Sequence, residues 1–313
     1  MAIGGAGLVV LLISRYRRDI GQARERVSRS ELAHTSCGPI EYAQIGVGAP
    51  VLIVHGAGGG FDQGLDIGEP LASAGFRVIA MSRFGYLRTP LPADASPAGQ
   101  ADAHAGLLDA LQIPQAAILG ASAGAPSSLQ LALRHPQRCS ALVLVVPVAF
   151  VAQTAAAMPR VGTVATESRF RTLLKSDLLF WAGIRYARST LIRSLLATPP
   201  ALVDGASPQE QARIDQTLRH VLPISLRRRG LDNDVAVIAA LERYDLERIA
   251  VPTLAVSAAD DLFATLDGTR YTAAHIAGAR LMVFPNGGHL LVGHRDELVT
   301  EIVAFLGETT RRG

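Results

Sequence analysis

The chain contains little cysteine and few aromatic residues. Cys37 and Cys139 are the only cysteines among 313 residues, too few for a disulfide framework or a zinc-finger ligand set. This usage weakly favours a reducing compartment. The 30 glycines and 17 prolines are too few for a fibrous or low-complexity chain. Hydrophobic residues make up 49% and charged residues 18%, so disorder is excluded as the main description and a sizeable core is available.

Most of the chain has no net positive charge. The formal net charge is +3, and residues 1–30 alone carry +4, which leaves −1 for the remainder. The basic side chains are nearly all arginine, since Lys175 is the only lysine. A nucleic-acid-binding protein carries its basic surface on the folded body. The charge distribution therefore excludes nucleic acid as the expected partner.

The N-terminus also lacks an apolar run of full membrane-spanning length. Residues 1–14 have no charged side chain, but a spanning helix needs about 20 apolar residues. No basic segment precedes the run and no Ala-x-Ala site follows it, so it does not resemble a secretory signal. Apolar residues then recur at helical spacing opposite an arginine-rich face: Ile13, Tyr16, Ile20, Ala23 and Val27.

Two interpretations of residues 1–29 follow from this pattern. The first is a membrane anchor formed by residues 1–28, with Arg15, Arg17 and Arg18 on the cytoplasmic side. The second is a helix that packs on the protein itself or on a partner. Under both interpretations we expect the body of the protein in the cytoplasm.

From residue 30 the pattern predicts an α/β fold. Residues 31–36 and 40–45 flank Cys37-Gly38-Pro39 and predict a hairpin. Continuous apolar runs predict buried strands at 50–54, 77–81, 116–119, 141–146, 253–256 and 281–284. Helical segments between strands predict a mostly parallel sheet with helices on both faces. The core is expected at 30–147 and 246–313, with a helical cap insertion at 148–245.

The strongest local motif is Gly-Ala-Ser-Ala-Gly at residues 120–124. It follows an apolar strand and precedes a helix, which is the context of a nucleophile elbow. The motif predicts Ser122 as a catalytic nucleophile. Serine needs a base, usually a histidine oriented by a carboxylate.

The base and the acid are expected after the last two strands. The run ending at residue 256 leads into Asp260 and Asp261, and the run ending at 284 leads into Gly287-Gly288-His289. We predict Asp260 as the acid, with Asp261 as the alternative, and His289 as the base. His294 is a weaker candidate for the base. His55 precedes a glycine-rich turn and is expected to make structural hydrogen bonds.

Residues 30–310 resemble the α/β-hydrolase fold superfamily. The resemblance rests on four motifs in order: His-Gly-Ala-Gly-Gly-Gly at 55–60, the elbow at 120–124, the Asp260 segment, and Gly-Gly-His at 287–289. It implies an oxyanion hole from the backbone amides of Ala123 and Ala57, with Gly58 as the alternative to Ala57. It implies no metal and no organic cofactor. Ser257 stands where the family usually has glycine before the acid, and Ser82 stands where an aspartate is common.

The expected function is that of a carboxylesterase or lipase-like serine hydrolase acting on a small to medium apolar ester or thioester. Dehalogenases and epoxide hydrolases of the superfamily use an aspartate nucleophile and are excluded by Ser122. Meta-cleavage C–C hydrolases and cofactor-free haloperoxidases keep the serine and remain alternatives. A ligand-binding receptor built on the same fold is the alternative of another class. The arginines 227–229 are expected on a solvated face, with recognition of an acidic group as the alternative.

Overall fold

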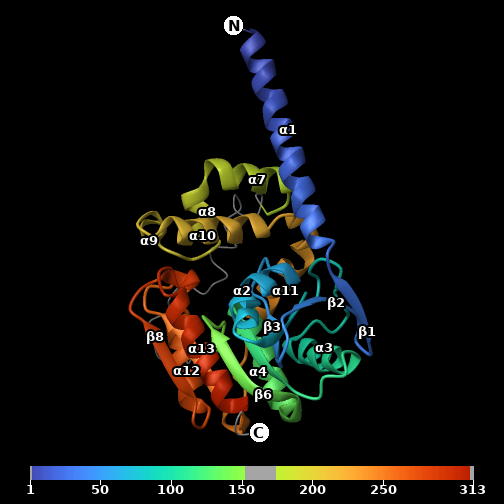
Figure 1. The fold of residues 1–313 in the computed structure, drawn as a ribbon, viewed down its shortest axis with the longest axis vertical. Helices are drawn as coiled ribbons and strands as arrows, with labels where there is room; N and C mark the ends of the chain where they lie inside the picture. The colour runs from blue at the N-terminus through green and yellow to red at the C-terminus, as the bar shows by residue number, and fades with distance from the viewer. Residues whose placement is uncertain (1, 152–173, 311–313) are drawn as a thin grey trace.

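The computed structural model describes residues 2–151 and 174–310, and its elements are drawn in Figure 1. The strands are β1 (Glu31–Thr35), β2 (Gly38–Ile45), β3 (Ala49–Val54), β4 (Phe76–Met81), β5 (Ala116–Ala121), β6 (Cys139–Val145), β7 (Thr253–Ala258) and β8 (Arg280–Phe284). The helices of the core are α2 (Phe61–Ser73), α3 (Pro97–Ala110), α4 (Ala125–Arg134), α12 (Thr265–His275) and α13 (Arg295–Thr310). The remaining helices are α1 (Ala2–Val27), α7 (Asp177–Tyr186), α8 (Arg188–Ser194), α9 (Pro200–Asp204), α10 (Pro208–His220) and α11 (Arg228–Ala239).

The eight strands form one sheet in the order β1-β2-β4-β3-β5-β6-β7-β8. β1 and β2 pair as the predicted hairpin, β2 runs antiparallel to β4, and all the other neighbours are parallel. The predicted α/β fold with a mostly parallel sheet is confirmed. The carboxyl ends of the parallel strands therefore meet at one edge, where ligands bind in open α/β sheets.

Both faces of the sheet are covered, which explains why the strand sequences are apolar without alternation. On β3, Leu52 and Val54 pack into the cluster that contains α3 and α4. Val51 and Ile53 face the opposite way, into the cluster that contains α2 and α13. All four side chains are buried. The sheet is thus a rigid support for the loops at its carboxyl edge.

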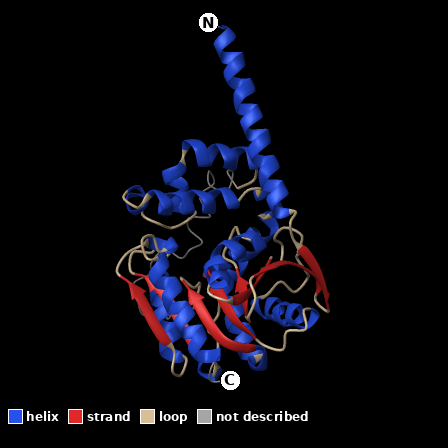
Figure 2. Ribbon diagram, in the orientation of Figure 1, coloured by secondary structure: helices blue, strands red, loops and turns tan. Residues whose placement is uncertain are grey.

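The helices α7 to α11 lie between β6 and β7 in the sequence, within the predicted insertion. Figure 2 shows a layer made of helices above the body that contains the strands. The layer has a core of its own, in which Phe180, Trp181, Leu191 and Ile192 are buried. Residues 152–173 of the predicted insertion lie outside the described residues.

The helix α1 has two parts with different surroundings. Its C-terminal half buries Ile20 and Ala23 against the helical insertion and Val27 against the core. Its N-terminal end projects beyond the insertion (Figure 1). Packing on the protein itself, the second interpretation of this segment, therefore holds for the C-terminal half. Among the described residues, no helix combines the length and the apolar character that crossing a bilayer requires.

Candidate active site

Ser122 lies on a sharp turn between β5 and α4. Its φ angle is +49°, a left-handed conformation that costs energy for a residue with a Cβ. The turn is possible because glycines lie two residues before and two residues after Ser122. A Cβ at Gly120 would collide with the Ser128 side chain, and one at Gly124 would collide with the carbonyl oxygen of Val54. The predicted strand–turn–helix context of the motif is confirmed.

Three side chains form a continuous hydrogen-bonded chain at this turn. His289 Nε2 lies 2.9 Å from Ser122 Oγ, and His289 Nδ1 lies 2.8 Å from Asp261 Oδ2. His289 is 9% exposed and Asp261 is 6% exposed. With Nδ1 donating to the carboxylate, Nε2 of the neutral ring is free to accept the hydroxyl proton of Ser122.

The prediction of Asp260 as the residue that contacts the histidine is wrong. Asp260 instead accepts a hydrogen bond from the Gly288 amide at 2.8 Å. The reason is the length of β7, which continues to Ala258 and pairs one residue further through Ala259 N–H and the Phe284 carbonyl. The turn therefore begins two residues later than the apolar run predicts, and Asp261, the alternative, faces His289.

The Asp261 carboxylate is held in its ionised form. Burial raises its pKa, but the opposing charge of His289 and three hydrogen bonds outweigh burial, and the net pKa lies below the usual aspartate value. The donors are His289, the Thr265 hydroxyl and the Phe263 amide. Thr265 is in turn hydrogen-bonded to Ser257 at 3.0 Å. An ionised Asp261 can stabilise the imidazolium that forms when His289 takes a proton.

The glycine-rich segment after β3 passes directly beside Ser122. A Cβ on Gly56 would lie 3.2 Å from Ser122 Cβ, so a larger residue would crowd the nucleophile. The Gly56 amide donates to Gln63 Oε1 at 3.0 Å, and the Gly58 amide donates to the Tyr86 hydroxyl at 3.2 Å. Between them, Ala57 is exposed in the cavity that contains Ser122. The assignment of its amide and that of Ala123 to an oxyanion hole stays a prediction.

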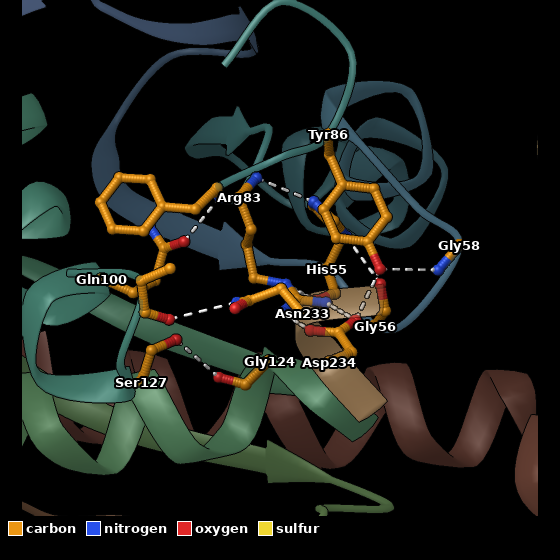
Figure 3. A network of polar contacts seen from close by, with 12 residues as sticks. His55, Gly56, Gly58, Arg83, Tyr86, Gln100, Gly124, Ser127, Asn233 and Asp234 are labelled. Carbon is orange, nitrogen blue, oxygen red and sulfur yellow. Dashed lines mark hydrogen bonds and ion pairs between the residues drawn. The ribbon is translucent and has the colours of Figure 1, made fainter. Parts of the chain in front are cut away.

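A buried polar network supports this segment from behind (Figure 3). His55 donates from Nδ1 to the Gly56 carbonyl at 2.7 Å and accepts from the Arg83 amide at Nε2 at 2.9 Å. Burial holds the pKa of His55 well below the usual value, with the Arg83 charge acting in the same direction. This neutral ring makes structural hydrogen bonds, as the sequence predicts.

The same network reaches the helical insertion. The Arg83 guanidinium makes two hydrogen bonds to Asp234 of α11, at 2.6 and 2.7 Å, and the Tyr86 hydroxyl donates to Asp234 at 2.5 Å. Since Tyr86 also accepts from the Gly58 amide and Arg83 Nε donates to the His55 carbonyl, both side chains connect α11 to the segment beside Ser122 (Figure 3).

A second buried cluster corrects the prediction of a solvated arginine face at 227–229. Arg227 is fully buried and bonds to Asp62 and to the Gly59 carbonyl. Arg26 of α1 bonds to the same Asp62 carboxylate at 3.1 Å. Burial raises the pKa of Asp62, but Arg227 and Arg26 outweigh it and lower the pKa to about 2. Arg228 and Arg229 are exposed, as expected.

The cavity beside Ser122 has a volume of about 600 Å³, within the usual range for small-molecule sites. Most of its wall is apolar: Ile67, Leu71, Val145, Val146, Leu195, Leu196, Phe263, Leu290, Leu291, Leu298, Val299 and Ile302. Its arginine and histidine side chains lie close to carboxylates. Arg213 pairs with Glu210, His220 with Asp66, and Arg295 lies 3.9 Å from Glu69.

The other candidates do not join this site. His294 bonds to Asn286 at 2.9 Å and stacks on Phe284. Within residues 2–151 and 174–310, no group of three histidine, cysteine or acidic side chains is placed to hold a metal ion. Sequence reasoning missed Thr265, Tyr86 and Asp234, because no local pattern marks a hydroxyl or a carboxylate that meets its partner only through tertiary packing.

Comparison with known proteins identifies the family of this chain. The family model for the alpha/beta hydrolase fold matches residues 49–294. A hydrolase from Paraburkholderia xenovorans, named for 2-hydroxy-6-oxononadienedioate and 2-hydroxy-6-oxononatrienedioate, is 30% identical over 85% of this chain and 90% of its own length. A hydrolase of the same name from Pseudomonas putida is 31% identical over 80% of this chain and 85% of its own.

A solved structure gives the same result. The alpha/beta hydrolase fold protein from Nakamurella multipartita superposes with a TM-score of 0.68 and 28% identity, covering 88% of this chain and 98% of that one. The shared fold therefore spans most of this chain and nearly all of that structure.

Proposed function

Because the chain belongs to the α/β-hydrolase fold family, we propose that it is a serine hydrolase that cleaves an uncharged carboxylic ester or thioester. The observation that carries the proposal is the Ser122–His289–Asp261 chain, with both hydrogen bonds shorter than 3 Å. The left-handed turn presents Ser122 to a mainly apolar cavity.

The reaction proceeds through an acyl-enzyme. Ser122 Oγ attacks the carbonyl carbon while His289 Nε2 takes the hydroxyl proton, and the oxyanion accepts hydrogen bonds from the Ala57 and Ala123 amides. His289 then gives the proton to the leaving alcohol or thiol. A water molecule, deprotonated by His289, attacks the acyl carbon and releases the acid. Asp261 holds the imidazole in orientation and offsets its positive charge.

The cavity favours an uncharged substrate. Arg213, Arg295 and His220 lie in its wall, and each has a carboxylate within ion-pairing distance. A substrate carboxylate would have to displace one of these partners. The apolar lining supplies the binding energy for an acyl or alcohol chain of small to medium size.

A C–C bond hydrolase is the second candidate. Two relatives at 30% and 31% identity carry the names of hydrolases of 2-hydroxy-6-oxo dienedioates, and the same catalytic serine serves C–C bond cleavage. This candidate requires an acidic substrate to bind near Arg213 or Arg295, although each of these arginines already lies close to a carboxylate.

Labelling with a fluorophosphonate probe tests the activated serine. We expect one adduct by intact-protein mass in the full chain, and none in Ser122→Ala, because only a serine with an adjacent base attacks phosphorus at a useful rate. Ser128→Ala, a buried serine on α4 that bonds to the Gly124 carbonyl, is the matched control and should keep the adduct.

A substrate panel then separates the two hydrolase candidates. Nitrophenyl esters and acyl thioesters of increasing length are expected to be cleaved faster than ring-cleavage dienoic acids. Faster turnover of the dienoic acid would replace the ester proposal by the C–C hydrolase. A folded protein that neither takes the probe nor cleaves any substrate would indicate a ligand-binding receptor.

We also propose that the enzyme works in the cytoplasm at the surface of a membrane. The support is the projecting N-terminal end of α1, with exposed apolar residues followed by Arg15, Arg17 and Arg18. Attachment at the surface needs no spanning helix.

A further inference from the structure

A second large cavity lies outside the active site, between α1 and the helical insertion. Its volume is about 620 Å³, close to that of the catalytic cavity. Five arginines and two aspartates line it: Arg15, Arg26, Arg185, Arg188, Arg219, Asp19 and Asp215. The formal charge of its ionised wall is therefore positive by three, which favours an anionic ligand.

Two of these arginines make no ion pair with any described residue. Arg15 and Arg219 are exposed and have no ion-pair partner among the described residues. By contrast, Arg26 bonds to Asp62 and to the Leu222 carbonyl, and Arg188 bonds to Asp215 at 2.6 Å. Two free guanidinium groups can make bidentate hydrogen bonds to a phosphate without breaking an existing pair.

Aromatic residues lie at this cavity, and Tyr186 is the most exposed of them. Trp181 donates to Asp19 at 2.9 Å and has the Arg185 guanidinium 5.1 Å above its ring. Tyr16 packs edge-on against Trp181, and Tyr186 on the cavity wall is 70% exposed. Tyrosine is enriched where protein meets lipid headgroups, so the exposed Tyr186 suits such an interface, whereas Trp181 is buried.

The apolar end of α1 begins within one helical turn of the cavity. Val9, Val10, Leu11 and Ile13 are each between 46% and 67% exposed. Ile13 and Leu11 lie two and four residues before Arg15 on the helix. An apolar helix surface followed by arginines is the arrangement of a segment that lies in the interface of an anionic bilayer. Exposed apolar residues also occur on α7, where Leu178 and Leu179 are 49% and 41% exposed.

We propose that this cavity holds the phosphate headgroup of an anionic phospholipid while the apolar end of α1 enters the bilayer interface. The proposal rests on the surface attachment proposed above and is independent of the hydrolase chemistry. The proposed headgroup site adjoins the catalytic cavity, because His220 lies in the walls of both.

Vesicle co-sedimentation of the full chain tests the proposal. We expect binding to phosphatidylcholine vesicles that contain phosphatidylglycerol, and weak binding to phosphatidylcholine alone. The double variant Arg15→Gln/Arg219→Gln should bind roughly thirtyfold more weakly to the anionic vesicles, since each basic residue near such a surface contributes a factor of about five. Ile13→Asp should lower binding to both kinds of vesicle.

Arg229→Gln/Arg270→Gln is the matched control, because it removes the same charge at exposed positions outside the cavity. An equal loss of vesicle binding in this control would overturn the headgroup site, as it would show that net charge alone decides. Displacement by inorganic phosphate, measured against chloride at equal ionic strength, separates the two sources of phosphate. Tight binding of inorganic phosphate without vesicle binding would overturn the lipid assignment.

Self-association through α1 is the remaining alternative occupant. A full chain that is dimeric by sedimentation velocity, becomes monomeric in Ile13→Asp and ignores vesicles would overturn the proposal in favour of a second copy. Fluorophosphonate labelling of Ser122 in the same preparations reports separately on the hydrolase, so that a failure of one proposal is not mistaken for a failure of the other.

Discussion

The two adjacent aspartates after β7 have different roles. Asp261 contacts the His289 ring, whereas Asp260 fixes the backbone of the same loop through the Gly288 amide. The sequence was sufficient to place Ser122 and His289, because each lies at the end of a strand in a motif with few interpretations. It could not decide between the aspartates, because a difference of one residue in the strand end changes which carboxylate faces the histidine.

Exchanging each aspartate for asparagine separates these roles. Asp261→Asn is expected to lower kcat on a nitrophenyl ester by roughly 10⁴-fold, because the amide favours the wrong tautomer of the histidine. Asp260→Asn keeps an oxygen that can accept from the Gly288 amide, and we expect less than a tenfold loss. Circular dichroism checks that both variants fold. Equal losses would contradict the assignment of Asp261.

At the scale of the elements, the helical insertion does more than cover the cavity. Its helix α11 reaches the Gly58 amide through Asp234 and Tyr86. Residues just before α9 hold the histidine loop, since the Ala197 carbonyl accepts from the His289 amide and Thr198 Oγ1 accepts from the Leu290 amide. The strands and their order follow from apolar runs and turns in the sequence. The contacts of the insertion do not, because they join residues about 90 to 150 positions apart.

Removal of one hydroxyl tests whether the insertion positions the oxyanion segment. Tyr86→Phe leaves the Gly58 amide and one oxygen of Asp234 without this partner, and we expect kcat to fall roughly tenfold with little change in KM. Tyr42→Phe is the matched control, because its hydroxyl also bonds to a carboxylate, Glu31 at 2.9 Å, but lies outside the catalytic cavity. If the role of Tyr86 were purely structural, Tyr86→Phe would lower the free energy of unfolding and leave kcat unchanged, as we expect for Tyr42→Phe.

At the scale of the whole molecule, two histidines of the described residues, His55 and His104, are completely buried outside the active site. Burial lowers the pKa of His55 well below its usual value and that of His104 to about 3. His104 is held between Met81 Sδ and Ser127 Oγ. In the unfolded chain both side chains take up protons below about pH 6.5, whereas in the folded protein they stay neutral. Above about pH 6.5 these histidines therefore do not reduce the free energy of unfolding, and as the pH falls below this value the free energy of unfolding decreases.

Urea unfolding as a function of pH measures this loss. Below about pH 6, the free energy of unfolding is expected to fall by about 1.4 kcal/mol per pH unit for each of the two histidines. His104→Gln should remove one of these two contributions to the slope, even if it lowers the overall stability. Replacement of His34, which is exposed on β1, is the control. A slope unchanged in His104→Gln would contradict the neutral buried form.

The packing of α1 also determines where the protein can be shortened. The boundary that the sequence suggests, before residue 30, would remove Ile20, Ala23 and Val27 from three buried positions and would take Arg26 away from Asp62. A chain that starts there would expose apolar surface on both the insertion and the core. A chain that starts between the projecting end and Tyr16 keeps every one of these contacts. A shortened chain for crystallography or enzymology should therefore begin where α1 starts to pack on the protein, about fifteen residues before this helix ends.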